Sequence, residues 1–359
     1  MLITGAGASC PFGVNSPLAL MADWSKALVQ KVVDKSLSVG HRQLLGLDDT
    51  MGDGPKFEQH LGRFLRTVEA LDAIKPFLKP SLEIFGIPQT IKMLSSGQSE
   101  LENWYSITKT AISELVDALN QTLYELFGDV AVNYQAAERG YGWLLQELGV
   151  STETPWVCAT TNYDVIAETV LDRLGFLPDW GRPHQPTLAS DVPLRVGNMI
   201  GGIGRYVPVL HLHGRIGWLL RDSVVRELPV NSYSKDWGAP VVMWPDDQKD
   251  VDSYAASQVI DSLWQQFGMA LSRAKKVLVL GHSLNDVFLL RAIANNVPAG
   301  RVAVALLADR PEQIFGPANG PIVERVRGTI GDVSFIPMTF GEERNGVDQL
   351  QQWMARAEG

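Results

Sequence analysis

Residues 3–9 read Ile-Thr-Gly-Ala-Gly-Ala-Ser, a short apolar strand that runs directly into a glycine-rich turn. Gly5 and Gly7 permit backbone angles and close approaches that a Cβ atom would block. A turn of this kind, placed before a helix, can leave backbone N–H groups for the anionic oxygens of a phosphate. Alone the signal is weak, because a tight strand-to-helix connection without a ligand uses the same residues.

The strand before this turn is short. Met1–Thr4 offers at most four residues, whereas a strand usually has about five. We therefore expect either that the first strand is truncated or that the natural protein begins upstream.

The second half of the chain alternates short apolar stretches with helical patterns. Fully apolar strands separated by helices are typical of a parallel sheet covered on both faces. The expected strands are Trp156–Thr160, Val207–Leu212, Val241–Trp244, Lys276–Gly281, Val302–Leu307 and Ser334–Pro337. The expected helices are residues 166–174, 252–274, 286–295 and a terminal helix around 347–353. Together with the glycine turn, this order predicts a Rossmann-like α/β fold.

The stretch between the glycine turn and Pro155 has a helical pattern throughout. Apolar residues recur at helical spacing in Leu18–Val33, Phe57–Leu71, Ser99–Gly128 and Val130–Leu148. We therefore predict a large α-helical insertion domain over residues 15–149. The Rossmann-like domain would then consist of residues 1–14 and 150–359.

The composition excludes several classes of protein. Of the 359 residues 45% are hydrophobic and the net charge is −9, so we do not expect a broad nucleic-acid-binding face. No stretch approaches the ~20 apolar residues of a membrane span, and the amino terminus lacks the basic segment of a signal peptide. We therefore expect a cytoplasmic protein without membrane contacts. Only Cys10 and Cys158 are present, which excludes a thiolate zinc site.

The glycine turn departs from the usual dinucleotide fingerprint. That fingerprint has a third glycine at the helix start and an acidic ribose ligand about 20 residues on, after a second strand. Here that distance falls on Ala22, Asp23 and Trp24, within helical sequence. The chain is therefore not predicted to be a standard dehydrogenase.

Three further short motifs follow expected strands or their ends. They are Thr160–Asp164 (Thr-Thr-Asn-Tyr-Asp), His213–Gly214 and Gly281–Leu284 (Gly-His-Ser-Leu). Together with the glycine turn, and in this order, they make the chain resemble the sirtuin family over residues 1–13 and about 155–310. The helical block has no counterpart in this resemblance.

The resemblance implies a site for NAD⁺ at these strand ends. It implies that Asn162 lies beside the nicotinamide ribose and orients the attacking nucleophile, and that Asp164 helps to hold the nicotinamide amide. His213 would contact the ribose hydroxyls and serve as a base, a task that suits imidazole. The other expected contacts to NAD⁺ come from Gly5, Ala6, Gly7, Ser9, Thr161, Gly281, Ser283 and Asp309.

Some of these residues also have a structural explanation as helix caps. Asn162 and Asp164 lie between a strand and a helix, where either could cap the helix. Ser283 and Asp286 form a capping-box pattern for the following helix. A capping role and a ligand-binding role are compatible at the end of a strand.

The histidines likewise have alternatives. His213 could be a hydrogen-bonded core histidine. His211 lies two residues earlier and is expected to face the same side of its strand, so the pair could bind a metal. A catalytic metal usually needs a third protein ligand, and no second cluster suggests one, so we expect no metal.

The chain departs from protein-deacylating sirtuins in two places. Those enzymes carry a four-cysteine zinc module, which this chain cannot build, and a Gly-Ile-Pro-x-Phe-Arg loop after the glycines. Here residues 10–15 read Cys-Pro-Phe-Gly-Val-Asn, without an arginine. What remains resembles the zinc-free bacterial sirtuin-like effectors of antiphage systems, which hydrolyse NAD⁺ to nicotinamide and ADP-ribose.

We therefore predict an NAD⁺ glycohydrolase that uses no zinc and depletes NAD⁺ in antiphage defence. Such an enzyme must stay silent until triggered, which predicts a homo-oligomer and association with a helicase-like hexameric ATPase or another sensor protein. One alternative is a protein deacylase or ADP-ribosyltransferase, which the missing zinc module disfavours. The other is a non-catalytic module that senses NAD⁺ or ADP-ribose.

Overall fold

The computed structural model divides the chain into two compact units. The first comprises Met1–Ala19, Tyr124–Met243 and Tyr254–Gly359, and the second comprises Leu20–Leu123 and Trp244–Ser253. The structure describes residues 1–14, 26–27, 30, 109–110, 113–128, 131–181, 192–193, 205–221, 224–228, 238–243, 257–282, 284–307, 320–338, 340 and 346–356. Both sheets described below belong to the first unit.

Seven parallel strands form the main sheet, in the order β11-β10-β9-β1-β2-β5-β3. The strands are β1 (Leu2–Thr4), β2 (Cys158–Thr160), β3 (Leu177–Asp179), β5 (Tyr206–His211), β9 (Val277–Leu280), β10 (Val302–Leu307) and β11 (Val333–Met338). At the centre, Thr4 of β1 is in register with Thr160 of β2 on one side and with Leu280 of β9 on the other. The chain fills one half of the sheet before it returns to the other, which is a Rossmann-like layout.

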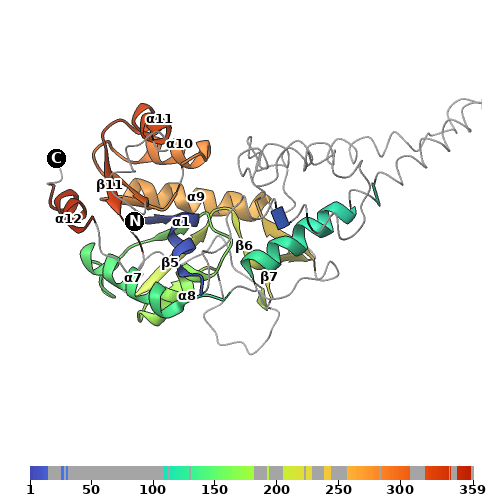
Figure 1. The fold of residues 1–359 in the computed structure, drawn as a ribbon. Helices are drawn as coiled ribbons and strands as arrows, with labels where there is room; N and C mark the ends of the chain where they lie inside the picture. The colour runs from blue at the N-terminus through green and yellow to red at the C-terminus, as the bar shows by residue number, and fades with distance from the viewer. Residues whose placement is uncertain are drawn as a thin grey trace, which may run out of the picture. The chain divides into compact units, whose positions relative to one another are not determined.

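Helices cover both faces of this sheet (Figure 1). They are α1 (Ala6–Ser9), the short 3-10 helix η1 (Cys10–Phe12), α7 (Tyr134–Glu147), α8 (Ile166–Arg173), α9 (Ser257–Arg273), α10 (Val287–Asn296), α11 (Gly320–Ile330) and α12 (Val347–Ala355). α7, α8 and α12 share a buried apolar cluster with alternate strand residues such as Leu2, Cys158 and Leu278. α10 contacts α9 and α11, and Figure 1 shows α9 and α10 on the opposite side of the sheet from α7 and α8.

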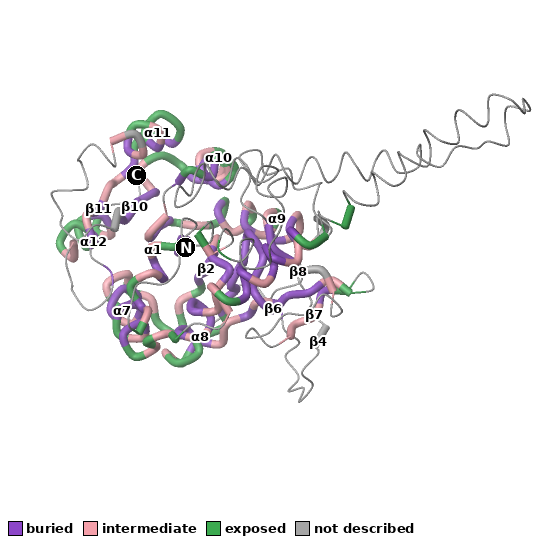
Figure 2. Tube along the Cα trace, turned by 45° about the vertical axis from the view of Figure 1, so that its right-hand side comes forward, coloured by how far each residue is buried: buried purple, intermediate pink, exposed green. Residues whose placement is uncertain are grey.

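The central strands are buried from both sides because helices lie on both faces. Figure 2 shows this burial along the strands, with exposed residues gathered on the outer sides of the helices. Leu2 and Ile3 of β1 are adjacent in sequence and face opposite sides, yet both are almost completely buried. This explains why the strands read as continuous apolar runs rather than as alternating patterns.

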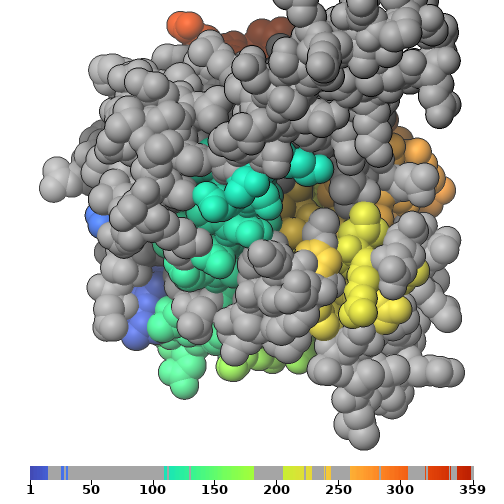
Figure 3. All heavy atoms as spheres, turned by 90° about the vertical axis from the view of Figure 1, so that its right-hand side faces the viewer, coloured from blue at the N-terminus to red at the C-terminus, as the bar shows by residue number. Residues whose placement is uncertain are grey.

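A second, antiparallel sheet follows directly from β5. It contains β4 (Val192–Pro193), β7 (Val224–Glu227), β6 (Gly214–Arg221) and β8 (Ala239–Val242), in that order. Only Leu212 and His213 separate β5 from β6. Gly214 has φ +80°, and a Cβ there would lie 2.0 Å from the carbonyl oxygen of Val241, so this tight passage requires glycine. Residues of this sheet, drawn in yellow, reach the surface in Figure 3.

Most of the expected elements outside the helical block are present, with ends shifted by a few residues. The expected strand Trp156–Thr160 is shorter, because only Cys158–Thr160 pairs with its neighbours. The elements that we did not expect are β3, β4, β6, β7 and α11. β6 and β7 are the main omission, since they form most of the antiparallel sheet.

The predicted helical insertion lies largely outside the described residues. The helices expected over 18–33 and 57–71 cannot be compared, and the insertion domain stays a prediction. Residues 113–127 are helical, and the Gly128 N–H closes the last turn on the Tyr124 carbonyl at 2.9 Å. α7 packs on the main sheet and belongs to the first unit, although it falls within the residues 15–149 predicted for the insertion.

No helix within the described ranges is both long enough and apolar enough to cross a membrane.

Candidate functional site

The candidate site lies at the carboxyl edge of the main sheet. The four strands that precede the sequence motifs are neighbours there, in the order β9-β1-β2-β5. The chain leaves β1 toward β2 and later returns on the other side of β1, at β9, so the direction of connection reverses between β1 and β9. Ligands of open α/β sheets bind at the carboxyl edge beside such a reversal. The topology therefore brings all four motif-bearing segments to one edge.

The amide groups of the glycine turn are engaged within the protein. The Gly5 N–H donates to the Leu280 carbonyl at 3.0 Å, and the Gly7 N–H donates to the Gly281 carbonyl at 2.9 Å. The N–H groups of Gly5 and Gly7 are therefore not among those that this turn could leave for a phosphate. The reason is that β9 runs directly beside β1, so the end of β9 supplies carbonyl acceptors to the turn.

Close packing requires the glycine at position 5. Gly5 has an extended backbone, with φ −121°, so its torsion angles do not demand glycine. A Cβ at this position, however, would lie 2.8 Å from both the Gly281 carbonyl oxygen and the His282 Cα. Any side chain here would displace the segment after β9. This explanation of Gly5 holds whether or not a nucleotide binds.

Ser9, Asn162 and Asp164 form one hydrogen-bonded group, which we call the Asn162 group. The Asn162 Nδ2 donates to the Gly5 carbonyl at 3.0 Å and to the Ser9 Oγ at 2.9 Å. Ser9 in turn hydrogen-bonds the Asp164 carboxyl. Both N–H bonds of the Asn162 amide are thus used inside the protein. Its Oδ1 is then the atom with which this side chain can hold a further ligand.

Asp164 combines a structural contact with a shifted pKa. Its Oδ1 accepts the N–H of Ile166, the first residue of α8, at 3.0 Å. The N-cap position of α8 is Val165, without a side-chain cap, so neither Asn162 nor Asp164 is the N-cap considered as the structural alternative. Burial raises the pKa of the Asp164 carboxyl, and the hydrogen bonds from Ile166 and Ser9 oppose this shift. Asp164 therefore keeps a proton more readily than an exposed aspartate, which lets it donate a hydrogen bond to an uncharged ligand.

Thr161 and Ala6 also lie in the segments that follow β2 and β1. The Thr161 N–H donates to the Thr4 carbonyl at 3.1 Å, which holds the start of the motif against the end of β1. Ala6 is the first residue of the short helix α1. Both residues are at the carboxyl edge, as expected from their motifs.

His213 lies in the two-residue turn between β5 and β6 and pairs with a carboxylate. Its Nε2 is 2.8 Å from the Oδ2 of Asp286. Because Asp286 follows β9, this contact joins the ends of β5 and β9 across those of β1 and β2. The turn is also held through its backbone, since Met243 N–H donates to the His213 carbonyl and Trp264 Nε1 to the Leu212 carbonyl.

His211 points to a different part of the protein, which corrects the expectation that the two histidines face the same side. Its Nε2 is 3.4 Å from the Oε1 of Glu168 on α8, whereas His213 contacts the residue that caps α10 on the other face. His211 is the last residue of β5, but His213 lies beyond the strand, where alternation no longer applies. Among the described residues no group of three His, Cys, Asp or Glu side chains could hold a metal ion.

Glu168 is the centre of a buried ion-pair cluster that also contains His211, Arg215, Glu227 and Trp180. Arg215 donates from Nε to the Glu168 Oε1 at 2.6 Å, and the Arg215 Nη1 lies 3.0 Å from the Glu227 Oε1. The Trp180 Nε1 donates to the same Glu227 oxygen at 3.1 Å. This Glu168 cluster connects helix α8 and strand β5 of the main sheet with strands β6 and β7 of the antiparallel sheet.

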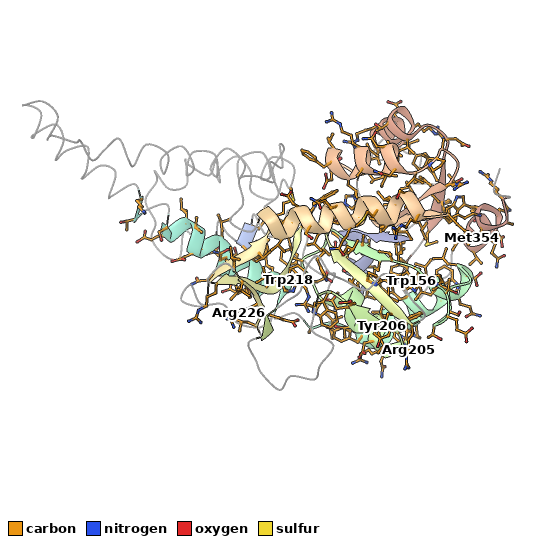
Figure 4. All side chains as sticks on the ribbon, turned by 180° about the vertical axis from the view of Figure 1, so that it is seen from behind. Trp156, Arg205, Tyr206, Trp218, Arg226 and Met354 are labelled. Carbon is orange, nitrogen blue, oxygen red and sulfur yellow. The ribbon has the colours of Figure 1, made fainter. Side chains whose placement is uncertain are left out.

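The Glu168 cluster lies at the end of β5 that meets the antiparallel sheet. The ring of Trp218 packs edge-on against His211, with centroids 5.5 Å apart. Figure 4 shows Trp218 within the antiparallel sheet, whereas Arg205 and Tyr206 lie at the opposite end of β5. The cluster is therefore on the same side of the fold as the carboxyl edge.

The Glu168 carboxylate is held in its charged form despite its burial. Burial alone would raise the pKa of this group, but its interactions with His211 and Arg215 outweigh burial and lower the pKa from 4.5 to about 2. The second carboxylate oxygen of Glu168 and both ring nitrogens of His211 lack a hydrogen-bond partner within the described part of the chain. The cluster therefore depends on charge attraction as much as on hydrogen bonds.

The segment after β9 has a constrained backbone. Gly281 has φ +62°, and Leu284 has φ +53° although its side chain is fully buried. A leucine in this region is strained. The Leu284 N–H donates to the Nδ1 of His282 at 2.8 Å, which holds the segment in this form.

The helix cap of α10 differs from the expected one. Asp286 itself is the N-cap, and its Oδ1 accepts the N–H groups of Phe288 and Leu289. The expected capping box with Ser283 at the cap position is therefore wrong, because Asp286, three residues after Ser283, occupies the cap position. Ser283 itself and Asp309 lie outside the described residues, so their expected contacts with NAD⁺ cannot be placed.

Two features of the site are not predicted from the sequence. Asp286 is expected there only as a capping residue, without its pairing with His213. The Glu168 cluster is not expected either, because Glu168 lies within a helix and Arg215 within an unexpected strand. A signal for the first was available, since Asp286 follows one strand of the expected parallel sheet and His213 follows another, and the carboxyl ends of such strands share an edge.

Neither a scan against protein-family models nor a search of curated proteins finds a match to this chain. The fold is a Rossmann-like α/β fold with three kinds of polar group at the carboxyl edge of its main sheet. These are the Asn162 amide, whose two N–H bonds are used inside the protein, the Asp164 carboxyl, whose pKa burial raises, and the His213–Asp286 pair. Such a set can hold a polar ligand, orient a water molecule and accept a proton from it.

Proposed function

We propose that this protein is a zinc-free sirtuin-like NAD⁺ glycohydrolase, which cleaves the bond between nicotinamide and ribose. The observation that carries the proposal is the Asn162 group, in which residues of the glycine turn and of the Thr160–Asp164 motif are joined by hydrogen bonds. The two motifs are more than 150 residues apart in sequence. Their junction at the carboxyl edge is what a shared ligand site requires.

The chemistry follows from the charge of the substrate. The nicotinamide ring of NAD⁺ is cationic, so it leaves as a neutral molecule without needing a general acid. Positive charge develops on the ribose, and a water oxygen forms the new bond to C1′ as the carbon–nitrogen bond breaks. Groups placed to hold that water and to stabilise the developing charge therefore carry the catalysis.

Asn162 and His213 divide this task. The Oδ1 of Asn162 accepts a hydrogen bond from the attacking water, while its Nδ2 remains bound to Gly5 and Ser9. His213 accepts the proton that the water loses, or activates a ribose hydroxyl. Asp164, whose pKa is raised by burial, donates to the carboxamide of nicotinamide.

The rest of NAD⁺ would extend along the carboxyl edge toward β9. We assign its contacts to Ala6, Ser9, Thr161 and Gly281, together with Ser283 and Asp309. Gly5 contributes through close backbone packing. The N–H groups of Gly5 and Gly7 already donate to the carbonyls of Leu280 and Gly281. This differs from a phosphate loop that presents its amides to the pyrophosphate.

An enzyme that consumes a central cofactor must be controlled. We assign this control to the helical insertion over residues 15–149, to assembly into a homo-oligomer, and to a partner such as a helicase-like hexameric ATPase or another sensor protein. The biological setting that fits such a gated enzyme is antiphage defence in the cytoplasm. Substitutions on the insertion are expected to change assembly or activation before they change the affinity for NAD⁺.

The test is release of nicotinamide from NAD⁺ by the full-length protein, alone and with candidate partners. Under conditions where the wild type is active, Asn162→Ala should abolish release while the fold is kept. Asn133→Ala is the matched control, because Asn133 caps α7 through its side chain and is not part of the site. Wild-type turnover by Asn162→Ala would reject the proposal.

The same assay separates the two alternative functions. Release of nicotinamide that requires an acylated peptide would identify a deacylase or a transferase. Tight binding of ADP-ribose without any turnover, with and without partners, would identify a sensor module. Release that needs neither peptide nor acceptor supports hydrolysis.

A further inference from the structure

We propose that Asp286 is a positioning residue for His213, which fixes the tautomer of its ring so that Nδ1 is the nitrogen that accepts a proton. This inference rests on the proposed function for its catalytic meaning. Its structural content, the state of the His213 ring, can be measured without any substrate.

The contact between these residues is short and shielded. The Nε2 of His213 lies 2.8 Å from the Oδ2 of Asp286, and the two residues are only 8% and 4% exposed. A hydrogen bond between an imidazole and a carboxylate at this distance is charge-assisted. The two residues come from segments after β5 and β9, with β1 and β2 between them. The pair therefore depends on the assembled sheet and not on neighbours in sequence.

The other oxygen of Asp286 is held by the start of α10. Oδ1 accepts the N–H of Phe288 at 3.0 Å and the N–H of Leu289 at 3.1 Å. Two donors at a helix N-terminus favour the charged form of the carboxylate. An ionised carboxylate only accepts hydrogen bonds. The Nε2 of His213 must therefore carry the proton in the neutral ring, which leaves Nδ1 unprotonated.

The segment that carries Asp286 is held rigidly. Leu284 is buried with φ +53°, and its N–H donates to His282. Strained residues persist only where the surroundings fix them. Because the backbone before Asp286 is fixed and the helix after it is capped, the carboxylate has little freedom to leave His213.

The fixed tautomer gives His213 a defined role in hydrolysis. The proton lost by water moves to Nδ1 as the water oxygen bonds to C1′, and the ring becomes an imidazolium with both nitrogens protonated. The charge on that imidazolium is balanced by the adjacent Asp286 carboxylate. Asp286 itself keeps no proton, and its two oxygens are held by His213 and by the start of α10, so it acts through His213.

The variant Asp286→Asn tests this role. Asparagine is as good an N-cap as aspartate, so the Oδ1 contacts with α10 are kept and the protein should fold. The amide would now present N–H groups to the Nε2 of His213, which forces Nε2 to accept and moves the proton to Nδ1. We expect loss of nicotinamide release by about 10²–10⁴-fold, the range for loss of a general base, with the loss in kcat and not in KM.

The direct readout is ¹⁵N NMR of His213, which distinguishes the two neutral tautomers. The wild type should show the proton on Nε2, and Asp286→Asn should show it on Nδ1. Asn133→Ala, which removes a helix cap elsewhere, should leave the tautomer unchanged. A wild-type ring protonated on Nδ1, or an unchanged tautomer in a folded Asp286→Asn protein, would overturn the inference.

These outcomes are independent of the proposed function. If the tautomer switches but the wild type never releases nicotinamide, the positioning role stands and the proposed hydrolase activity fails. If the wild type releases nicotinamide and Asp286→Asn does so equally well, the hydrolase activity stands and the positioning role fails.

Discussion

The surroundings of His211 and of His213 differ although the two residues are separated by a single position. His211 ends a strand, is fully buried and belongs to the Glu168 cluster, which ties two sheets together. His213 lies in the next turn and pairs with Asp286 at the edge of the main sheet. The first region has the character of a structural support, and the second has the character of a site.

The difference arises because His211 lies inside strand β5 and His213 lies just after its end, so their side chains contact different parts of the protein. Inside β5 the alternation of side chains directs His211 into the layer between the sheet and α8. Once the chain leaves the strand, the turn places His213 toward α10, on the other face. Gly214 makes this turn possible, because the backbone passes so close to β8 that no side chain fits there. The predictions below test this contrast between the two regions.

The largest effect on stability is expected from Glu168→Ala. The substitution removes the centre of the Glu168 cluster and leaves Arg215 and His211 buried with fewer partners. Loss of one partner of a buried ion pair costs about 3–5 kcal/mol, and we expect a decrease of this size in the free energy of unfolding, measured by chemical denaturation. Asn133→Ala, which removes one helix cap, should cost only about 1 kcal/mol. Equal values for the two variants would mean that the Glu168 cluster is not a structural support.

Substitution of His213 should mainly lower activity, whereas substitution of His211 should mainly lower stability. His213→Ala should lower nicotinamide release by about 10²–10⁴-fold, as expected for loss of a general base, with little change in the free energy of unfolding. His211→Ala should mainly destabilise the fold, because it removes a buried partner of Glu168. Paired rate and denaturation measurements check this.

The opposite pattern would contradict the contrast between the two regions. If His211→Ala kept its stability but lost activity as fully as His213→Ala, the two residues would belong to one site. Stoichiometric zinc in the purified protein, lost on either substitution, would reopen a metal-binding role for the pair.

Stability should also depend on pH through Glu168. Its pKa in the folded state, about 2, lies below the usual 4.5, so its charged form favours the folded protein. That contribution is fully present above pH 4.5 and is lost as the pH falls from about 4.5 to about 2. Asp164 acts with the opposite sign, because its pKa is raised by burial and its protonated form favours folding.

Glu168→Gln isolates this effect. The variant cannot titrate at position 168, so its free energy of unfolding should fall less than that of the wild type between pH 4.5 and pH 2. Parallel curves for the two proteins in this window would show that Glu168 is not held in its charged form.

The smallest effect is expected from Ser9→Ala, within the Asn162 group. The substitution removes the hydroxyl between Asn162 and Asp164 but leaves the Asn162 bond to Gly5. The lost bond to Asn162 contributes about 0.5–1.5 kcal/mol, so nicotinamide release should fall by roughly twofold to tenfold. Ser272→Ala is the control, because Ser272 is exposed on α9 and bonds only its own helix. No difference between these two variants would remove Ser9 from the site.

Much of the fold could be predicted because its strands are continuous apolar runs. Val277–Leu280 and residues 302–305 are buried on both sides, and such runs between helices indicate a parallel sheet. Most of the antiparallel sheet could not be predicted, because its strands have no such clear sequence signal. β6 follows β5 after only two residues, without the loop that usually marks a new strand, and its position depends on contacts with β7 and β8 that are distant in sequence.

The sequence could predict which motif residues lie at the site, but it could not predict their partners from distant segments. Asn162, Asp164 and Ser9 lie in short motifs whose roles are implied by the family resemblance, and the fold joins them. The engagement of the Gly5 and Gly7 amides by β9 could not be predicted, because it depends on which strand lies beside β1. The partners of His211 and His213 likewise come from α8 and from the start of α10.

The most direct test of the account is the ratio of products from NAD⁺ in the absence of any acylated peptide. The full-length wild-type protein, alone and with candidate partners, is incubated with NAD⁺, and nicotinamide and ADP-ribose are quantified over time. The account predicts equal amounts of the two products, and none from Asn162→Ala. Nicotinamide release that requires an acyl-peptide, or equal turnover by Asn162→Ala, would contradict it.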